Sequence, residues 1–511
     1  MYNIANISPS RYSSTEKITS TMQTSKKTQE EEIVDKNAFN EFPRIHAYFQ
    51  EHRQNLIDDI MQMIRIPSVN APAQENAPFG VECTHALEAM AERAATFGLK
   101  PAILENKVTY IDMNDASTQL DILAHVDVVP ASDSWTVTEP FVPKLADGKL
   151  YGRGTCDDKG PAVAALYAMR AVHELEILLR YNTRLILGAD EETGFRDINC
   201  YYSHFAEAPY TYSPDGEYPV TNIEKGGLYT SYFSIWEGDT PIPCVRRIDS
   251  GVVGNAVPNN AEAVLEGVCA DDVARIAQEV NAQTGISFTW EEQGALLTIH
   301  AEGRSAHASI PWEGNSALTG LLTLLMRLPL TPCVGLERLR ALSEFFPHGA
   351  FYGEAVGIAQ ADKLSGELVL TSNVLHYTEN SMNGRIDCRA PICASKENVL
   401  DVLQSKLAAR GLILAEDSKM VPPHYVPEES PFIQTLLQCY EYVMKEPGRC
   451  LSTGGGTYVH YLKNGVAFGA FKPDVDYHMH GEDEYLVVDE IVQSAELFAL
   501  TIVALCGEYA D

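Results

Sequence analysis

Short apolar runs that alternate with helical patterns constrain the fold of this chain most strongly. Residues 120–124 and 183–189 are short apolar runs that predict strands. A helix is predicted between them over 161–178, because Pro161 suits a first turn and apolar residues recur at helical spacing. Alternation of this kind is typical of an α/β sheet. We therefore predict a mixed, mostly parallel sheet flanked by helices, which include segments over 39–66 and 84–97.

The pattern changes after Gly227. Residues 295–300 and 382–388 alternate apolar with polar side chains, which predicts antiparallel strands with one solvated face. Helical segments are predicted around them, over 271–283, 316–327 and 397–410. The chain then returns to its first style, with a helix over 431–444 and a strand over 466–471. We expect a second α+β domain, with an antiparallel sheet, to be inserted into the first.

These patterns predict four stretches of chain. Residues 1–36 are a disordered tail, because most of this segment is rich in Ser, Thr, Gln and Lys and cannot bury enough apolar surface to order itself. Residues 37–226 form the first part of the α/β domain, 227–421 the insert, and 422–511 the second part of the α/β domain.

Charge and composition exclude several classes of partner. The chain has 38 Lys+Arg and 70 Asp+Glu, so its formal charge is 38 − 70 = −32. This charge argues against nucleic acid and anionic membranes, and no apolar stretch is long enough to predict a membrane span. The 11 cysteines are scattered and contain no C-x-x-C pair, so neither a disulfide framework nor a thiolate zinc site is predicted. We expect a cytoplasmic protein.

Side chains that can bind metals follow the predicted strands or lie on the turns beside them. Ligands in open α/β sheets collect outside the carboxyl ends of the strands, so these segments could converge. Imidazole and carboxylate groups suit zinc or manganese. The segments are 125–127, 151–160, 190–192, 213–215 and 478–480.

Each segment also has a simpler explanation. A single His after a strand is more often structural, and a Glu-Glu pair is usually a solvated face. The Asp-Asp-Lys-Gly turn at 157–160 could cap the following helix, because carboxylates favour helix N-termini. Their order and placement together favour a metal site.

Several motifs resemble those of the co-catalytic zinc exopeptidase family, which includes aminoacylase, carnosinase, desuccinylase and PepV-type bacterial dipeptidases. The sequences H-V-D-V-V-P, G-R-G-T-C-D-D-K-G-P and D-E-E carry this resemblance, at 125–130, 152–161 and 190–192. Four further motifs are most similar to the PepV-type dipeptidases, and they lie at 213–217, 224–227, 303–309 and 454–458. The resemblance extends from about residue 39 to 505.

The resemblance implies a site for two zinc ions, with manganese or cobalt as possible substitutes. One ion would be bound by His125 and Asp215, the other by Glu192 and His480, and Asp157 would bridge them. Asp215 and His480 are separated by 480 − 215 = 265 positions, far too many for a loop, so a domain must be inserted there.

Two of these assignments had neighbouring alternatives. Asp157 is preferred to Asp158 because the family places its ligand two residues before the Lys of the motif. His480 is preferred to His478 because the family shows a His followed four residues later by Glu, here Glu484.

The resemblance also implies catalytic roles. Glu191 would be the general base on a metal-bridging water. Asp127 would accept a hydrogen bond from the far nitrogen of His125 and so fix its tautomer. His307, in the inserted lid, would stabilise the tetrahedral oxyanion with Asn255 as its companion.

The substrate's free carboxylate would be held by Arg389, with help from backbone donors around Gly455, Gly456 and Thr457. Simpler explanations stay open here too. Residues 454–456 could form a plain turn, and Arg389 could pair with an acid inside the insert.

The implied activity is that of a metal-dependent dipeptidase acting on dipeptides or other small amides. The alternatives are a deacylase of N-acyl amino acids with the same metal site, and a non-catalytic sensor of amino acids or peptides. The insert is long enough to supply His307 within one chain, as in the PepV type, so we expect a monomer.

Overall fold

The computed structural model of this chain describes residues 36–238 and 241–508. The predicted tail, apart from its last residue, lies outside this part of the chain. Within the described ranges, no helix is both long enough and apolar enough to cross a membrane.

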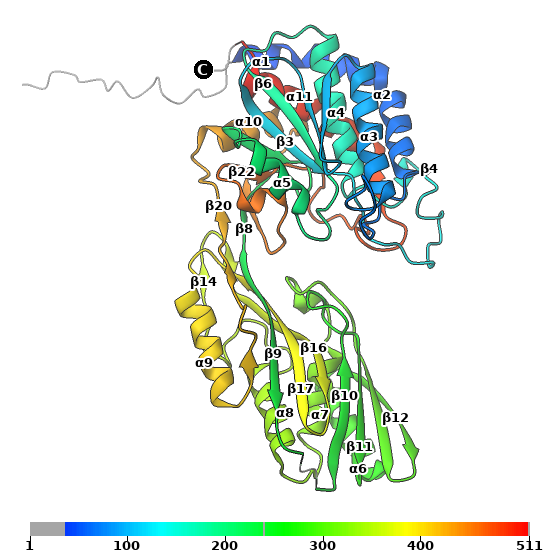
Figure 1. Cartoon of the computed structure of the whole chain (residues 1–511), viewed down its shortest axis with the longest axis vertical. Helices are drawn as coiled ribbons and strands as arrows, with labels where there is room; N and C mark the ends of the chain where they lie inside the picture. The colour runs from blue at the N-terminus through cyan, green and yellow to red at the C-terminus, as the bar shows by residue number, and fades with distance from the viewer. Residues whose placement is uncertain (1–35, 239–240, 509–511) are drawn as a thin grey trace, which may run out of the picture. The chain divides into compact units, whose positions relative to one another are not determined.

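The first sheet is mixed and has parallel strands at its centre (Figure 1). Its order is β1-β2-β6-β3-β7-β22-β8-β20, and β21 pairs with β8. The central pairs β6-β3, β3-β7 and β7-β22 are parallel, whereas β1, β2 and β20 pair in antiparallel fashion. The bounds are β1 Lys100–Leu104, β2 Val108–Asp112, β3 Thr118–His125, β6 Asn182–Gly188, β7 Tyr210–Ser213, β8 Val220–Glu224, β20 His424–Tyr425, β21 Cys450–Thr453 and β22 Gly465–Ala467.

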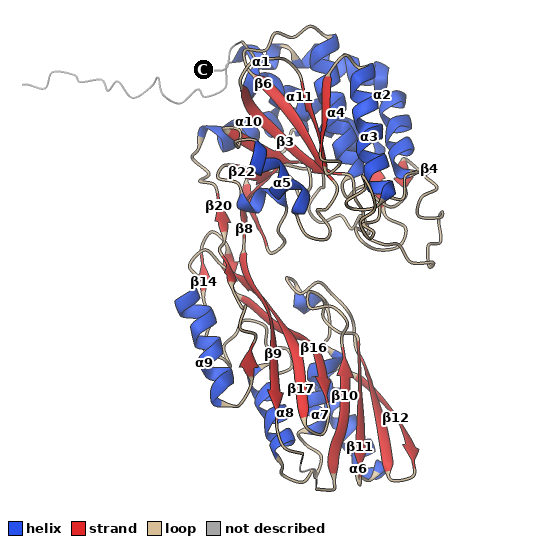
Figure 2. Ribbon diagram, viewed as in Figure 1, coloured by secondary structure: helices blue, strands red, loops and turns tan. Residues whose placement is uncertain are grey.

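Alternating side chains of the central strands bury both faces of this sheet. Ile122 and Leu187 point into the main core with helices α2, α3, α4, α10 and α11, whereas Leu123 and Ile186 pack with α5 and η3 on the other face. Figure 2 shows helices α2, α3 and α4 gathered beside strands β3 and β6. The bounds are α1 Lys36–Asn40, α2 Phe42–Ile64, α3 Val81–Thr96, α4 Lys159–Glu174, α5 Arg196–His204, α10 Pro431–Met444, α11 Val488–Cys506 and η3 Tyr458–Tyr461.

The predicted helices and strands of this part are present, with shifted ends. Helix α4 ends at Glu174 and not at 178, because the chain turns at Glu176, which has a φ of 53°. Strand β22 is three residues long, shorter than the predicted 466–471. Helix α11 is not among the predicted helices, although it is buried along most of its length.

The second sheet is antiparallel throughout, with the order β12-β13-β11-β10-β16-β17-β9-β18, and β19 pairs with β9. The predicted alternating strands lie in β13 and β17. Its strand bounds are β9 Gly226–Ile235, β10 Cys244–Ser250, β11 Asn260–Glu266, β12 Ser287–Gln293, β13 Leu296–Glu302, β16 Val369–Tyr377, β17 Ser381–Ala390, β18 Ile413–Leu414 and β19 Met420–Val421. The predicted fold class, a mixed α/β sheet with an inserted antiparallel α+β part, is confirmed.

Helices of the insert bury one side of the second sheet in a core of their own. Their bounds are α6 Ala270–Thr284, α7 Ala317–Leu325, α8 Val334–Phe345 and α9 Asp401–Ala409, with the short helices η1 Pro311–Glu313 and η2 Lys396–Leu400. Two small sheets complete the fold, with strands β4 Lys144–Ala146, β5 Lys149–Tyr151 and β23 Tyr485–Val487 in one, and β14 Ala361–Asp362 and β15 Gly366–Glu367 in the other.

The chain passes between the two large sheets twice, at neighbouring points. Only Lys225 separates β8 from β9, and Pro422 and Pro423 separate β19 from β20. These two passages touch, because a side chain at Gly226 would lie 2.4 Å from the carbonyl oxygen of Val421. The predicted domain borders fall at these passages, and the domain division itself stays a prediction.

Candidate active site

Asp157 lies between two histidines at the carboxyl end of the first sheet. Its Oδ1 is 2.9 Å from His125 Nε2, and its Oδ2 is 2.7 Å from His480 Nε2. His125 ends strand β3, Asp157 lies in the turn before α4, and His480 comes from the loop before β23. One carboxylate thus presents a separate oxygen to each imidazole.

Two more carboxylates complete this arrangement. Asp215, after β7, has its Oδ2 3.7 Å from His125 Nε2, and Glu192, after β6, has its Oε1 3.3 Å from His480 Nε2. The distances therefore form two sets that share Asp157, as the predicted ligands are grouped. One ligand atom each of His125, Asp157 and Glu192 lies within 4.8 Å of the others.

The neighbouring residues that were weighed as alternatives point elsewhere. Asp158 Oδ2 accepts a hydrogen bond from the backbone N–H of His125 at 3.1 Å. His478 is exposed, and its Nδ1 contacts the carbonyl oxygen of Glu482 at 3.1 Å. The geometry therefore favours Asp157 and His480 as the residues that face the centre.

Burial and like charges raise the pKa of most acids in this cluster. Burial, followed by the charge of Asp157, raises the pKa of Asp215 to about 7 and also raises the pKa of Glu192. Burial raises the pKa of Glu191 well above its usual range. Burial would also raise the pKa of Asp157, but the hydrogen bonds of His125 and His480 outweigh it and lower the pKa.

This donor set fits divalent cations. The cluster contains more carboxylates than its two histidines can neutralise. In addition, Glu192 Oε1 is buried and has no hydrogen-bond partner among the described residues. Bound cations would offset the repulsion that raises these pKa values. The ligand types, imidazole and carboxylate, are those that zinc and manganese accept.

Asp127 supports the centre in a different way from the expected one. His125 Nδ1 donates to the backbone oxygen of Asp127 at 3.0 Å, whereas the nearer carboxylate oxygen lies 3.4 Å away. The carboxylate instead accepts the backbone N–H groups of Glu191 and Glu192, at 3.2 and 3.1 Å. Asp127 therefore holds the imidazole through its carbonyl and the acidic turn through its side chain.

A buried ion pair, Arg153–Glu484, joins two of the loops and has no predicted counterpart. Arg153 Nη1 lies 2.5 Å from Glu484 Oε2, and Arg153 Nη2 donates to the backbone oxygens of His480 and Gly481, both at 3.1 Å. Glu484 Oε1 accepts the backbone N–H of Cys156 at 2.9 Å. The pair thus fixes the separation of Asp157 and His480. Its signal in the sequence was Arg153 inside the Gly-Arg-Gly motif.

A second buried acid holds the turn after β6. Asp197 Oδ2 accepts the backbone N–H groups of Ala189 and Asp190, at 2.6 and 2.8 Å, and also the hydroxyl of Tyr458. Tyr458 ends the Gly-Gly-Gly-Thr-Tyr motif, and its ring lies edge-on to His125 with centroids 6.3 Å apart. This contact links the glycine-rich motif to the turn that carries Glu191 and Glu192.

His307 and Asn255 lie together in the insert. The backbone N–H of Ala308 donates to the carbonyl oxygen of Asn255 at 2.8 Å. His307 Nδ1 accepts the backbone N–H of Ser309 at 3.3 Å and lies 2.6 Å from the Ser309 hydroxyl oxygen. Burial, and then the positive charge of Arg389, lower the pKa of His307. The ring is therefore neutral near pH 7 and carries its proton on Nε2.

Arg389 makes the ion pair inside the insert that is the simpler of its two predicted roles. Its Nε and Nη2 donate to the carboxylate of Asp387, at 2.7 and 2.9 Å, within the insert. Its Nη1 also donates to the backbone oxygen of Gly454 at 2.5 Å, in the glycine-rich motif. A guanidinium has five N–H groups, so two are left for a ligand.

The backbone donors of the glycine-rich motif are largely engaged. Thr457 donates both its N–H and its hydroxyl to Glu224 Oε1, at 3.2 and 2.9 Å, and the Gly455 N–H donates to the Thr453 hydroxyl at 3.1 Å. The Gly456 N–H has no hydrogen-bond acceptor within the described part of the chain. Of the three predicted donors, Gly456 is therefore the one left for a substrate.

His460 connects the glycine-rich motif to both passages between the sheets. Its Nδ1 lies 3.0 Å from Glu224 Oε2, at the end of β8, and its Nε2 lies 2.9 Å from the backbone oxygen of Pro422. Both partners are acceptors only, so both ring nitrogens must carry a proton. Burial opposes this charge, but Glu224 outweighs it and raises the pKa of His460.

The chain is similar to a known protein family. Residues 122–504 match the family model described as "Peptidase family M20/M25/M40". The chain is 31% identical over 460 residues to YtjP of Bacillus subtilis (strain 168), covering 89% of this chain and 97% of that protein. It is 29% identical to the Beta-Ala-Xaa dipeptidase of Lactobacillus delbrueckii subsp. lactis, covering 88% and 96%.

The fold also matches solved structures. Human carnosine dipeptidase 1 aligns with a TM-score of 0.57 at 14% identity, over 91% of this chain and 98% of that one. The aminoacylhistidine dipeptidase of Vibrio alginolyticus aligns with a TM-score of 0.54 at 14% identity, over 89% and 97%.

The Arg153–Glu484 pair predicts a loss of metal affinity in Glu484→Gln. Removing this charge should let the two loops separate, and partners that orient metal ligands are typically worth about 10- to 100-fold in affinity. Competition with a chelator, read by metal analysis, measures the change. Glu482→Gln, an exposed acid of the same loop, is the control and should keep its metal. An unchanged affinity in a folded Glu484→Gln protein would contradict this role.

The His460 contacts predict a pH-dependent contribution to stability. Folding raises the pKa of His460 above its unfolded value, near 6.5. The protonated His460 therefore contributes its full stabilisation below pH 6.5, and this contribution is lost as the pH rises through the pKa of the folded state. His460→Gln should lower the free energy of unfolding by about 3 kcal/mol at pH 6, as expected for a broken buried pair, and by less at high pH. Denaturant titrations across pH measure this difference. The exposed pair His376–Asp249 is the control, since His376→Gln should cost less than about 1 kcal/mol.

Proposed function

The chain belongs to peptidase family M20/M25/M40, and on that premise we propose that it hydrolyses dipeptides with the help of two zinc ions. The family is metal-dependent, so the chain is a metallopeptidase. The observation that supports the proposal most is the position of Asp157, whose two oxygens face His125 and His480 at 2.9 and 2.7 Å. The name of the Beta-Ala-Xaa dipeptidase, a relative over most of the chain, supports the substrate class.

The proposed ligands fall into the same two sets as the distances around Asp157. His125 and Asp215 would hold one ion, Glu192 and His480 the other, and Asp157 both. When bound, such ions polarise the scissile carbonyl and make a nearby water more acidic. Manganese or cobalt, which accept the same ligands, could replace zinc.

Glu191 is proposed as the general base. Its backbone is held by Asp127, and its side chain lies among acids whose charge, together with burial, raises its pKa. A carboxylate beside a metal site can accept the proton of a water that the bound ions would make more acidic. It accepts the proton of the attacking water and passes it to the amine that leaves.

The insert supplies the groups proposed to bind the rest of the substrate. The neutral His307 offers its Nε2–H to the oxyanion, and Asn255 lies beside it. The two remaining N–H groups of Arg389 and the free N–H of Gly456 are proposed to hold the substrate's carboxylate. Because all of these groups come from one chain, we propose that the enzyme works as a monomer.

A substrate panel tests the proposed activity. The metal-loaded enzyme should release amino acids from dipeptides much faster than from N-acetyl or N-succinyl amino acids, and amino-acid analysis measures both. Preferred cleavage of the acylated compounds would instead establish a deacylase. No hydrolysis of either class by the loaded protein would favour a binding protein over an enzyme.

Glu191→Gln separates the roles of base and ligand. Without its base the enzyme should lose about 10²- to 10⁴-fold in kcat, because general base catalysis is typically worth that much. Its metal content should be unchanged, since Glu191 is not a proposed ligand. The matched variant Asp157→Asn should lose metal as well as activity, because it removes the anion that both ions share. Activity that survives in Glu191→Gln would show that the base is another residue.

A further inference from the structure

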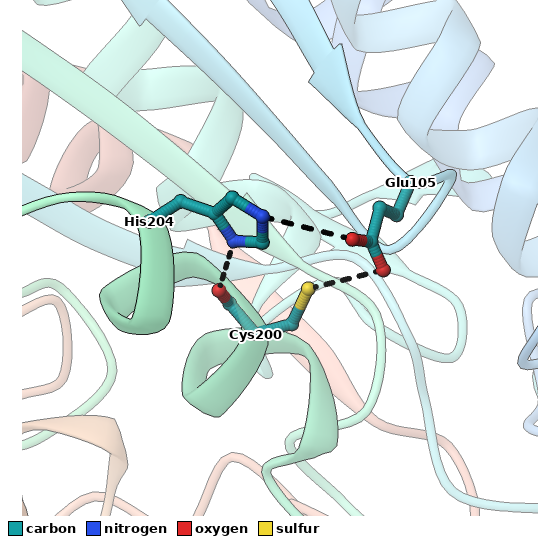
Figure 3. A group of neighbouring side chains, drawn as sticks. All are labelled: Glu105, Cys200 and His204. Atoms are coloured by element: carbon teal, nitrogen blue, oxygen red, sulfur yellow. Dashed lines mark hydrogen bonds and ion pairs between the residues drawn. The ribbon is translucent and has the colours of Figure 1, made fainter.

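Three side chains that can bind metals meet at a second place, on the turn between β1 and β2 and on helix α5 (Figure 3). Glu105 lies in the turn, and Cys200 and His204 lie on the helix. One ligand atom of each is within 4.8 Å of the others. None of the three belongs to the proposed active site.

The spacing along α5 directs two of these side chains to one side. Cys200 and His204 are four residues apart, so they share a helix face. Figure 3 shows both side chains directed at the carboxylate of Glu105. Cys200 Sγ lies 3.4 Å from Glu105 Oε2, and His204 Nε2 lies 3.8 Å from Glu105 Oε1.

These separations are near those of a tetrahedral zinc site. Zinc–sulfur bonds of about 2.3 Å and zinc–oxygen or zinc–nitrogen bonds of about 2.0 Å place sulfur about 3.5 Å from oxygen, and nitrogen about 3.3 Å from oxygen. The sulfur–oxygen distance already agrees. The two distances run to different oxygens of Glu105, so one ion would need a turn of that carboxylate as well as a shift of the exposed imidazole by about 0.5 Å.

The hydrogen bonds of His204 favour the tautomer that binds a metal. Its Nδ1 lies 3.0 Å from the backbone oxygen of Cys200, which can only accept. The Ser203 hydroxyl is also near this nitrogen, at 3.1 Å, and donates to the same carbonyl at 2.7 Å. The proton of the neutral ring is therefore on Nδ1, and the lone pair of Nε2 faces Glu105. A backbone carbonyl in this position is the usual partner of a metal-binding histidine.

A lysine shows that the cluster attracts positive charge. Lys107 Nζ lies 2.7 Å from Glu105 Oε2 and 3.8 Å from Cys200 Sγ. We propose that Glu105, Cys200 and His204 form a second metal site, for a zinc-like divalent ion that displaces the Lys107 ammonium and the thiol proton. The fourth position is left for water. Such an ion would tie the β1–β2 turn to α5.

Cobalt distinguishes this site from the proposed active site. A cobalt–thiolate bond gives a strong charge-transfer band in the near ultraviolet, and the proposed active site has only nitrogen and oxygen ligands. Titration with Co²⁺ of the full chain, first loaded with two zinc ions, should produce this band at one further ion per chain. Cys200→Ser should abolish it, whereas Cys393→Ser, at an exposed thiol of the insert, should leave it unchanged.

Lys107→Gln supplies a test in the opposite direction. Removing the competing ammonium should tighten Co²⁺ binding by about 1.5- to 5-fold, the range that a surface ion pair is worth. A band that survives in Cys200→Ser, or no band at all, would overturn the proposal. Neither result bears on the dipeptidase, whose activity and metal content are measured separately in Glu191→Gln and Asp157→Asn.

Discussion

Mutual repulsion among buried carboxylates is the constraint on which the active site depends. Glu191 and Glu192 share one loop, and Asp157 and Asp215 come from two others. Burial, and then the charges of their acidic neighbours, raise the pKa of Glu191, Glu192 and Asp215. Left to itself, such a group would separate or take up protons. The fold therefore has to oppose the repulsion with rigid supports, and the cluster retains a strong demand for cations. The repulsion among the carboxylates is therefore the origin both of the affinity for metal and of the need for a rigid scaffold.

The supports are themselves charged and buried, and each joins segments that are distant in sequence. Arg153 and Glu484 hold the turn before α4 against the loop before β23. Asp127 and Asp197 hold the turn after β6 by accepting backbone N–H groups. In each case the carboxylate accepts hydrogen bonds from several donors, which offset the free energy lost when the charged group is buried. The proposed ligands are thus positioned by a ring of hydrogen bonds around them.

Much of this could be predicted from the sequence, because the strands and the residues that follow them are local features. The fold class and the convergence of five loops follow from apolar runs and from the order of motifs. What could not be predicted depends on tertiary partners. The acceptor of His125 Nδ1 is a carbonyl, Thr457 is taken by Glu224, and Arg389 is paired with Asp387. Helix α11 escaped prediction although it is buried against α4 and α10.

The two adjacent passages between the sheets restrict how the insert can move. A single connection would let the insert rotate about it in any direction. Two neighbouring connections oppose twisting of the insert, so that bending is the easier movement. Pro422 and Pro423 fix the backbone angle φ in the connection between β19 and β20. The connection between β8 and β9 consists of a single residue, Lys225. Any bending of the insert would therefore follow one arc, and the proposed substrate-binding residues His307 and Arg389 would stay on it together.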